Sequence, residues 1–282
     1  MEAQTNLRDL RTHFKFGENW KGFSRLIDEE ALNKARRGLS RMLTEEQIQG
    51  ARFLDIGCGS GIHALAALSL GAREVVAIDI DPASVETTKE VLDRFGISSR
   101  ASVEVMSVFN ARSETMGLFD IVYSWGVLHH TGAMWAAVEQ AGKLVKPGGI
   151  FAIALYRKTS ACGFWAIEKR FYAHAPALIQ GIIRSAYKAA IISALALTGR
   201  NPVRYIRAYS KRGMNWNTDV HDWLGGYPYE STTSEETVQR VAAAGFRPVS
   251  IDKKPGGLGI FGSGCSEYVF QKESLRSNYT HV

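Results

Sequence analysis

The residues with the clearest chemical meaning form a glycine-rich turn after a short apolar segment. That segment, residues 52–56, carries Asp55 and leads into the turn Gly57-Cys58-Gly59-Ser60-Gly61. Glycines at alternate positions let the backbone turn tightly and approach a ligand closely, because no Cβ stands in the way. A dinucleotide-binding turn has its third glycine three residues after the second, where this chain has Ile62. A carboxylate beside the turn would repel a pyrophosphate, so the pattern favours a ligand with an ammonium or sulfonium group.

A second acid, Asp79, ends the next apolar segment, residues 74–79. Either feature alone would be an ordinary turn or strand end, but together and in β-α-β order they indicate a cofactor site. The stretch resembles motif I of class I S-adenosylmethionine-dependent methyltransferases, in which the second acid accepts hydrogen bonds from ribose hydroxyls. Residues 119–130 resemble the fourth-strand motif of small-molecule members, and residues 144–149 resemble their post-helix turn.

The resemblance covers about residues 53–156 well and the last two expected strands loosely. It is specific to the superfamily and names no substrate. Residues 13–20 and 222–227 are also similar to bacterial proteins grouped with the ubiquinone-pathway O-methyltransferases.

The resemblance implies a binding site for S-adenosylmethionine and no metal. Asp55 would lie near the ammonium and Asp79 would hold the ribose, while Ser124 and Trp125 would lie under the methionine portion. The implied cofactor-binding residues are Asp55, Gly57, Cys58, Gly59, Gly61, Asp79, Ile80, Ser107, Val108, Ser124, Trp125 and Trp20.

Methyl transfer from a sulfonium is an in-line displacement, and it needs a general base only when the acceptor must lose a proton. His129 and His130 follow the expected fourth strand at its carboxyl end, where open α/β sheets bind ligands. Either imidazole could instead cap a turn, and His130 is the favoured base. His221 and Asp222 are further candidates that could form a histidine–carboxylate pair.

The acceptor is expected to be a small anionic molecule. Residues 157–212 contain eleven lysines and arginines against one acid, Glu168, although the whole chain carries only +6. A concentrated basic segment indicates an anionic partner. Aromatic residues of the same region could line a pocket or could be ordinary core. The expected acceptor-binding residues are Phe16, Arg204, Arg207, Arg212, Trp216, Trp223, Tyr227 and Tyr229.

Short apolar segments that alternate with helical patterns predict an α/β fold, a Rossmann-like, doubly wound, mostly parallel sheet. Residues 1–50 would form an N-terminal helical lid, 51–156 the cofactor-binding core, 157–230 an inserted α-helical substrate cap after the fifth strand, and 231–282 the rest of the sheet and a tail. Ser234 is expected to be the N-cap of the helix that returns to the sheet.

Within the cap, residues 176–198 predict an amphipathic helix. Its apolar stripe, from Ile179 to Ala190, is expected to face the core, with peripheral contact to an anionic membrane as the alternative. Arg184 and Lys188 interrupt the apolar run and argue against a transmembrane helix. Three scattered cysteines and a polar amino terminus predict a cytoplasmic protein without disulfides.

Other functions remain open at this point. With 282 residues, 45% of them hydrophobic and 22% charged, the chain is long enough for a buried core and too apolar to be disordered. The alternatives are a methyltransferase for a lipid-linked quinone-type acceptor, a nucleic-acid methyltransferase and a non-catalytic cofactor-binding scaffold. The sequence disfavours nucleic acid, since Ser124-Trp125-Gly126-Val127 replaces an N-P-P-Y-type signature. Oligomeric state and acceptor atom stay open.

Overall fold

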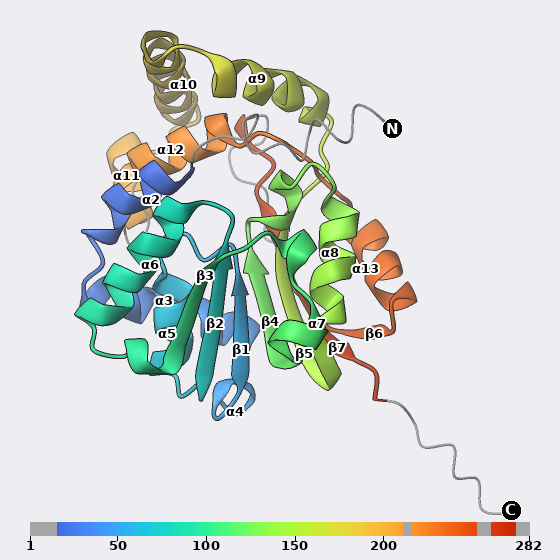
Figure 1. Ribbon diagram of the computed structural model, residues 1–282. Coiled ribbons are helices and arrows are strands. Elements are labelled where there is room, and N and C mark those ends of the chain that lie inside the picture. Colours follow the sequence, from blue (N-terminus) through green and yellow to red (C-terminus); the bar gives the residue numbers. More distant parts are fainter. Residues whose placement is uncertain (1–15, 211–215, 253–260, 275–282) are drawn as a thin grey trace, which may run out of the picture.

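The computed structural model describes residues 16–210, 216–252 and 261–274. They form a seven-stranded sheet in the order β3-β2-β1-β4-β5-β7-β6 (Figure 1). The first five strands in this order run parallel, and β7 is antiparallel to both of its neighbours. This confirms the predicted Rossmann-like sheet. The strands are β1 Arg52–Ile56, β2 Glu74–Asp79, β3 Ala101–Val105, β4 Phe119–Trp125, β5 Val145–Tyr156, β6 Phe246–Asp252 and β7 Cys265–Lys272.

Helices cover both faces of the sheet (Figure 1). One face is covered by α2 Phe16–Ser24, α3 Glu29–Met42, α4 Glu45–Ile48, α5 Ile62–Ser69 and α6 Pro82–Arg94. The other is covered by α7 Ser113–Met116, α8 Met134–Lys143 and α13 Ser234–Ala243. Alternate residues of β1 serve the two layers, since Phe53 packs with the first set and Leu54 with the second. Burial on both sides explains why the central strands β1, β2 and β4 are mostly apolar.

Two helices on opposite faces of the sheet, α6 and α13, begin at N-cap residues whose side chains accept backbone hydrogen bonds. Asp81 caps α6, because its carboxylate accepts a hydrogen bond from the N–H of Ala83 at 2.9 Å. At α13 the N-cap is Thr233, whose hydroxyl accepts from the N–H of Glu236 at 3.1 Å. The expected cap at Ser234 is therefore wrong by one residue, because two adjacent hydroxyl side chains are equally suited to capping.

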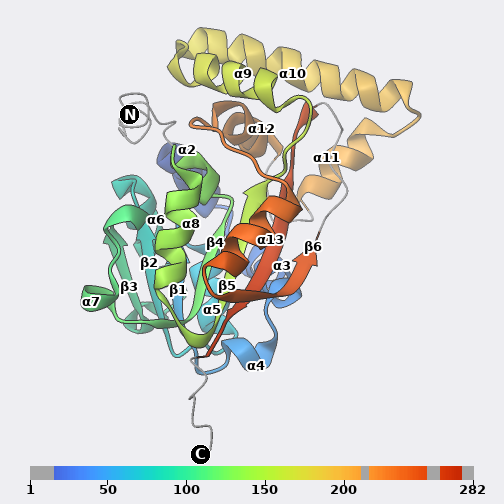
Figure 2. The same ribbon diagram turned by 90° about the vertical axis from the view of Figure 1, so that its right-hand side faces the viewer.

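In the described part of the chain, four helices lie between β5 and α13: α9 Cys162–His174, α10 Ala177–Leu197, α11 Pro202–Ser210 and α12 Trp216–Gly225. They lie above the carboxyl ends of the parallel strands, with α9 and α10 side by side and outermost (Figures 1 and 2). We call α9–α12 the cap. Its two ends meet at a parallel bridge between Arg157 and Thr232, where the N–H of Thr232 donates to the carbonyl of Tyr156 at 2.9 Å. The cap therefore leaves and rejoins the sheet at one point.

The orientation of α10 is the reverse of the expected one. Gln180 and Arg184 hydrogen-bond to Tyr172 of α9, and Lys188 donates to Asn217 of α12 at 2.6 Å. The polar stripe thus faces the rest of the cap. Ile182, from the apolar stripe, is 58% exposed. The prediction that the apolar stripe faces the core is wrong, because polar partners inside the cap bind the other side of the helix.

Among the described residues, α10 is the one helix whose length and composition would let it cross a bilayer, and 11% of its most apolar window is buried. Its inner face is joined to α9 and α12 by the hydrogen bonds of Arg184 and Lys188. Length and composition alone are weak grounds for a membrane span. The hydrogen bonds show that one side of α10 packs against the cap, and its other side is exposed to solvent.

Candidate functional site

The glycine turn between β1 and α5 has the left-handed backbone that its glycines allow. Gly57 and Gly59 have φ angles of 79° and 54°, which side chains rarely allow. A Cβ at Gly57 would also overlap the side chain of Val127, and one at Gly59 would lie 3.4 Å from the indole of Trp20. The turn is therefore held between the residues that follow β4 and the helix α2.

Two carboxyl groups flank this turn, the buried Asp55 and the half-buried Asp79. Asp55 is 2% exposed, and its Oδ2 atom is buried without a hydrogen-bond partner. Burial, with a smaller contribution from the charge of Asp79, raises the pKa of Asp55 to about 7. Asp79 accepts hydrogen bonds from the N–H groups of Gly59 and Asp81, at 3.0 and 2.9 Å. Burial nevertheless raises the pKa of Asp79 to about 6. Both groups would be stabilised as anions by a cationic or hydroxyl-bearing ligand.

The residues expected around the adenine lie near the ends of β2 and β3. Ile80 follows β2 directly and is 37% exposed, which is unusual for an isoleucine in a sheet core. Ser107 caps the 3-10 helix η3 Val108–Asn110 by accepting from the N–H of Phe109, and Val108 is buried. Cys58 is buried, and its sulfur accepts a hydrogen bond from the Thr88 hydroxyl.

Ser124 and Trp125, at the end of β4, are both engaged by neighbouring strands. The hydroxyl of Ser124 is fully buried and donates to the carbonyl of Ile56 at 3.0 Å. The indole N–H of Trp125 donates to Glu267 of β7 at 3.0 Å. These bonds tie the carboxyl ends of β1 and β4 to the amino end of the antiparallel strand β7, beside the glycine turn.

Helix α2 covers the turn from the other side. Trp20 lies over Gly59, and the N–H of Gly17 donates to Asp81 at 3.0 Å, which joins α2 to the start of α6. Phe16, the first residue of α2, lies with its ring centroid 5.4 Å from that of His130. The expected lid residues therefore do bridge the glycine turn and the histidines.

His129 and His130 form the 3-10 helix η4 Leu128–His130 directly after β4. The Nδ1 atom of His130 lies 2.7 Å from the carbonyl oxygen of Pro228. A carbonyl can only accept, so Nδ1 carries the proton and Nε2 is the proton-accepting nitrogen of the neutral ring. His129 is fully buried, its Nε2 atom has no hydrogen-bond partner, and burial lowers its pKa well below the usual value.

The polar-aromatic run 223–230 surrounds these two histidines. Gly226 leaves room for His130, since a Cβ there would lie 2.7 Å from the imidazole Cε1 atom. The N–H of Glu230 donates to the carbonyl of His129 at 3.0 Å. The carboxylate of Glu230 accepts from the N–H of Met134 and so caps α8. We infer that this part of the run positions the histidines.

His221 and Asp222 lie on α12, within the cap. The Nδ1 atom of His221 lies 2.7 Å from the hydroxyl of Tyr172 and accepts from Arg184 at 3.0 Å. Burial, followed by the charge of Arg184, lowers the pKa of His221 to about 4. The partners of its Nδ1 atom are therefore the Tyr172 phenol and the Arg184 guanidinium.

The expected acceptor-binding residues of the cap region differ in exposure and in their neighbours. Arg204 and Arg207 are exposed on α11, and Arg212 lies outside the described residues. Trp216 and Tyr227 are half-buried within the cap, near Lys188 and His174 respectively. Trp223 and Tyr229 are also half-buried but lie next to the sheet, since the centroid of each ring is 5.4 Å from that of Tyr156 at the end of β5.

The buried cation of this region is Lys169, which the sequence analysis did not single out. Its ammonium lies 3.6 Å from the centre of the Trp223 ring, and the side chain is fully buried. Trp165, Lys169 and Tyr172 do follow one face of α9 at helical spacing, and all three are buried. That spacing is the signal that could have drawn attention to the lysine.

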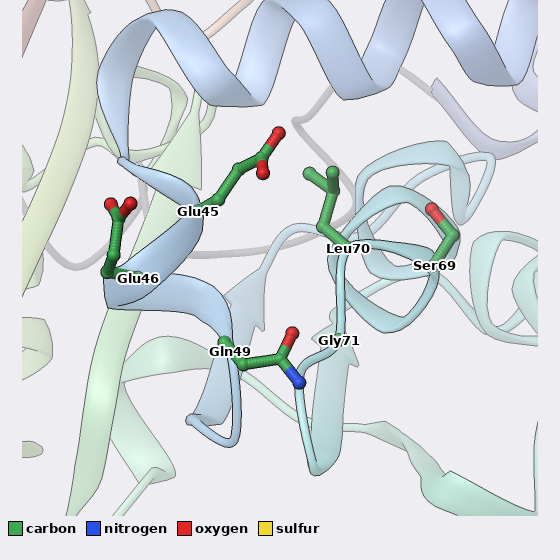
Figure 3. A pocket seen from close by; sticks show the side chains of 6 residues that line it. All are labelled: Glu45, Glu46, Gln49, Ser69, Leu70 and Gly71. Atoms are coloured by element: carbon green, nitrogen blue, oxygen red, sulfur yellow. The ribbon is translucent and has the colours of Figure 1, made fainter.

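A surface hollow lies away from these groups. It is lined by Glu45, Glu46, Gln49, Ser69, Leu70 and Gly71, between α4 and the end of α5 (Figure 3). These residues precede β1 and β2, so the hollow is at the opposite end of the sheet from the glycine turn. Among the described residues no cluster of three or more His, Cys, Asp or Glu side chains could hold a metal ion.

Comparisons with known proteins agree with this geometry. A family model described as a methyltransferase domain matches residues 27–250. Among curated relatives, the ribosomal protein L11 methyltransferase of Pseudomonas putida is 35% identical over 112 residues, which are 40% of this chain and 36% of that protein. The ubiquinone biosynthesis O-methyltransferase of Xanthomonas campestris is 34% identical over 131 residues, 46% of this chain and 53% of that protein. The chain thus spans from about a third to half of these relatives' lengths.

Solved structures share the fold at low identity. The 1,6-didemethyltoxoflavin-N1-methyltransferase of Burkholderia thailandensis has a TM-score of 0.50 at 19% identity, covering 85% of this chain and 79% of that one. The magnesium protoporphyrin IX methyltransferase of Synechocystis PCC 6803 has a TM-score of 0.52 at 12% identity, covering 86% and 84%. Sheet order, glycine turn and paired acids define an α/β enzyme that binds a nucleoside cofactor. The chain belongs to the class I S-adenosylmethionine-dependent methyltransferases.

Proposed function

We propose that this protein transfers the methyl group of S-adenosylmethionine to a small acceptor bound between the end of β4 and the cap. The observation that carries the proposal is a pair of acids with raised pKa values, the buried Asp55 and the half-buried Asp79, on either side of a glycine turn with positive φ angles. His130 lies on the neighbouring strand end with a defined tautomer.

The residues of the turn fit the cofactor. The unpartnered Oδ2 atom of Asp55 would accept a hydrogen bond from the amino-acid ammonium. Asp79 would accept from the ribose hydroxyls through lone pairs that the Gly59 and Asp81 N–H groups leave available. Ile80, exposed beside Asp79, would contact the adenine. When bound, S-adenosylmethionine supplies the methyl group as an electrophilic carbon on a sulfonium.

In the transfer step the protein acts mainly by alignment. Holding an acceptor in line with a reactive carbon lowers the activation barrier by about 7–11 kcal/mol. A general base contributes less, since it raises the rate by about 10²–10⁴-fold. Pro228 orients His130 so that Nε2 takes the proton of an acceptor hydroxyl or amine as the new bond forms. Closure of α2 through Trp20 and Phe16 would exclude water from the reacting atoms.

The position of the histidines beneath the cap favours a small acceptor. His129 is fully covered, and α12 and α9 lie above the strand ends (Figure 2). A folded protein or a duplex nucleic acid would have to displace the cap to reach η4. The relatives' names include a protein methyltransferase and a quinone-pathway enzyme, so the names alone do not choose between acceptor classes.

A lipid-linked acceptor is the second candidate, favoured by the outer face of the cap. Phe164, Ile167 and Phe171 of α9 are 64%, 74% and 61% exposed, and Leu178 and Leu197 of α10 are 75% and 88% exposed. Exposed apolar side chains flanked by basic residues match a helix pair that rests on an anionic membrane surface.

The proposal is tested by calorimetry and by a transfer assay. S-adenosylhomocysteine should bind the wild-type protein and bind Asp79→Ala at least tenfold more weakly, since hydrogen bonds of a charged group are worth about 1.5–3 kcal/mol. Labelled methyl groups should enter a small molecule in a fractionated extract of the source cell, and His130→Gln should slow the transfer without weakening cofactor binding. Absence of binding by the wild-type protein would refute the proposal.

A further inference from the structure

Lys169 of α9 is a buried ammonium without a conventional partner. Its side chain is fully buried, and Nζ has no hydrogen-bond acceptor. The neighbouring acid Glu168 does not supply one, because both of its carboxylate oxygens are likewise buried and unpartnered. A buried ammonium without acceptors costs several kcal/mol. A ligand that supplied hydrogen-bond acceptors to Nζ would offset this cost in free energy.

Aromatic rings surround this ammonium. The centres of the Trp223, Tyr229 and Trp165 rings lie 3.6, 5.5 and 5.7 Å from Nζ. Ring faces attract a cation, but they do not replace the acceptors that its three N–H groups need. The rings therefore hold the ammonium in position while leaving its hydrogen bonds to a further group.

The lysine and the histidines belong to one region. The Tyr156 ring lies 3.9 Å from the His129 ring and 5.4 Å from both Trp223 and Tyr229. The charge of Lys169 also contributes to the lowered pKa of His129. Two buried nitrogen atoms without partners, Nζ of Lys169 and Nε2 of His129, thus lie beside the proposed transfer site. We call Tyr156, Trp165, Lys169, Trp223 and Tyr229 the Lys169 cluster.

We propose that Lys169 binds an oxyanion of the methyl acceptor, and that the acceptor is a planar ring compound carrying one carboxylate or one ionised phenol or enol hydroxyl. This inference rests on the proposed function. One ammonium matches one delocalised negative charge, whereas a phosphate dianion would bring more charge than Lys169 neutralises. The ring faces of the Lys169 cluster suit a planar, apolar body next to that charge.

The electrostatics of the cluster agree with this role. Burial lowers the pKa of Lys169 and raises that of Glu168. A bound oxyanion would favour the charged ammonium and so raise the pKa of Lys169 again. Binding of an anion near neutral pH should therefore be accompanied by proton uptake.

Calorimetry on protein saturated with S-adenosylhomocysteine tests the inference with defined probes. Benzoate is compared with neutral benzamide, and 4-nitrophenolate with neutral 4-nitroanisole, so that the two pairs distinguish a carboxylate from a phenolate. We expect one anion or both to bind at least tenfold more tightly than its neutral partner. Lys169→Met should abolish that difference, since hydrogen bonds to charged groups contribute about 1.5–3 kcal/mol. Lys158→Met, at an exposed lysine of the same segment, should retain it.

Equal binding of the anions and their neutral partners, no binding of either anion, or unchanged anion binding by Lys169→Met would overturn the inference. If Lys169→Met does not fold, the wild-type protein labelled with ¹³C at lysine Cε decides the matter, because saturation with the bound anion must raise the titration midpoint of the buried lysine. Failure of S-adenosylhomocysteine itself to bind would instead count against the proposed function, so the two failures are distinguishable.

Discussion

The carbonyl oxygen of Pro228 lies 2.7 Å from the Nδ1 atom of His130, across 98 positions of the sequence. This bond joins the cap segment that returns to the sheet with the turn that leaves β4. It fixes both the tautomer and the direction of an imidazole placed where an acceptor would meet the cofactor. The geometry of one candidate catalytic group is therefore controlled from the cap.

Gly226→Ala should slow methyl transfer. The new methyl group would lie 2.7 Å from Cε1 of His130 and would displace the ring from the Pro228 carbonyl. We expect kcat to fall about 10- to 100-fold, within the range attributed to a general base, while S-adenosylhomocysteine affinity measured by calorimetry stays unchanged. Gly181→Ala on α10 is the matched control and should leave kcat intact, since the nearest atom to its Cβ is 4.0 Å away. Equal kcat for the two variants would remove His130 from the mechanism.

Helix α2 should control retention of the cofactor. In Gly17→Ala the new Cβ would overlap the Asp81 carboxylate and break the bond that joins α2 to α6. The dissociation rate of S-adenosylhomocysteine in stopped-flow fluorescence should rise about tenfold, because loss of a hydrogen bond to a charged group costs about 1.5–3 kcal/mol. Gly22→Ala lies on the same helix with no atom within 4 Å of its Cβ, so it should stabilise α2 by about 1 kcal/mol and leave the rate unchanged. A faster rate in both variants would mean that α2 is not a lid.

Cofactor binding should release protons in mildly acidic solution. The pKa values of Asp55 and Asp79 are raised to about 7 and about 6 by burial, and an ammonium beside Asp55 would lower them on binding. At about pH 6.5, titrations in buffers of different ionisation enthalpy should report release of up to about one proton, and affinity should weaken as the pH falls. Asp93→Asn, an exposed acid on α6, should behave as the wild type. A proton count of zero throughout would contradict the assigned role of Asp55.

The raised pKa of Asp55 also predicts how the stability of the cofactor-free protein depends on pH. An acid whose pKa is higher in the folded than in the unfolded state stabilises the fold in its protonated form. For Asp55 this contribution to the free energy of unfolding is complete below the unfolded pKa near 4, and it is lost as the pH rises through about 7. Thermal unfolding should therefore occur at lower temperature at about pH 8 than at about pH 5. Asp55→Asn should raise the unfolding temperature at about pH 8 by several degrees while weakening cofactor binding, and a lower temperature for this variant would refute the assignment.

The outer face of the cap should bind anionic membranes if the acceptor is lipid-linked. Ile167 and Phe171 of α9 are 74% and 61% exposed, and burying a side chain of this size is worth about 1.5–3 kcal/mol. Cosedimentation with phosphatidylglycerol vesicles should be detectable for the wild type, weaken with salt, and fall at least tenfold in Ile167→Glu/Phe171→Glu. Val249→Glu, at a residue 49% exposed on β6, is the control. Equal sedimentation of all three proteins would leave the soluble acceptor as the better candidate.

The sheet and the cofactor turn were readable from the sequence because their constraints are local. The glycines of the turn, such as Gly57, and the acid at the end of the next strand, Asp79, are informative because they occur together in β-α-β order, and both occupy the expected places. Parallel strands buried on two faces also differ clearly from amphipathic helices in their hydrophobic pattern.

The cap was less readable because its contacts join distant residues of similar type. The stripe from Ile179 to Ala190 shows that α10 is amphipathic, but it does not show which face is covered, and the hydrogen bonds of Arg184 and Lys188 reverse the expected orientation. Burial of Lys169 depends on Trp223, more than 50 residues away. The basic segment 157–212, which the sequence predicts to act as one anion-binding surface, thus contains both the buried Lys169 and the exposed Arg204 and Arg207.

The single junction at Arg157 and Thr232 has a consequence for how such enzymes diversify. Because the cap departs and returns at adjacent backbone positions, its length and helix content can change without altering the register of β5 or the start of α13. A segment attached in this way is exchangeable, so related chains could acquire new acceptors by replacing one block of sequence while inheriting the cofactor machinery intact.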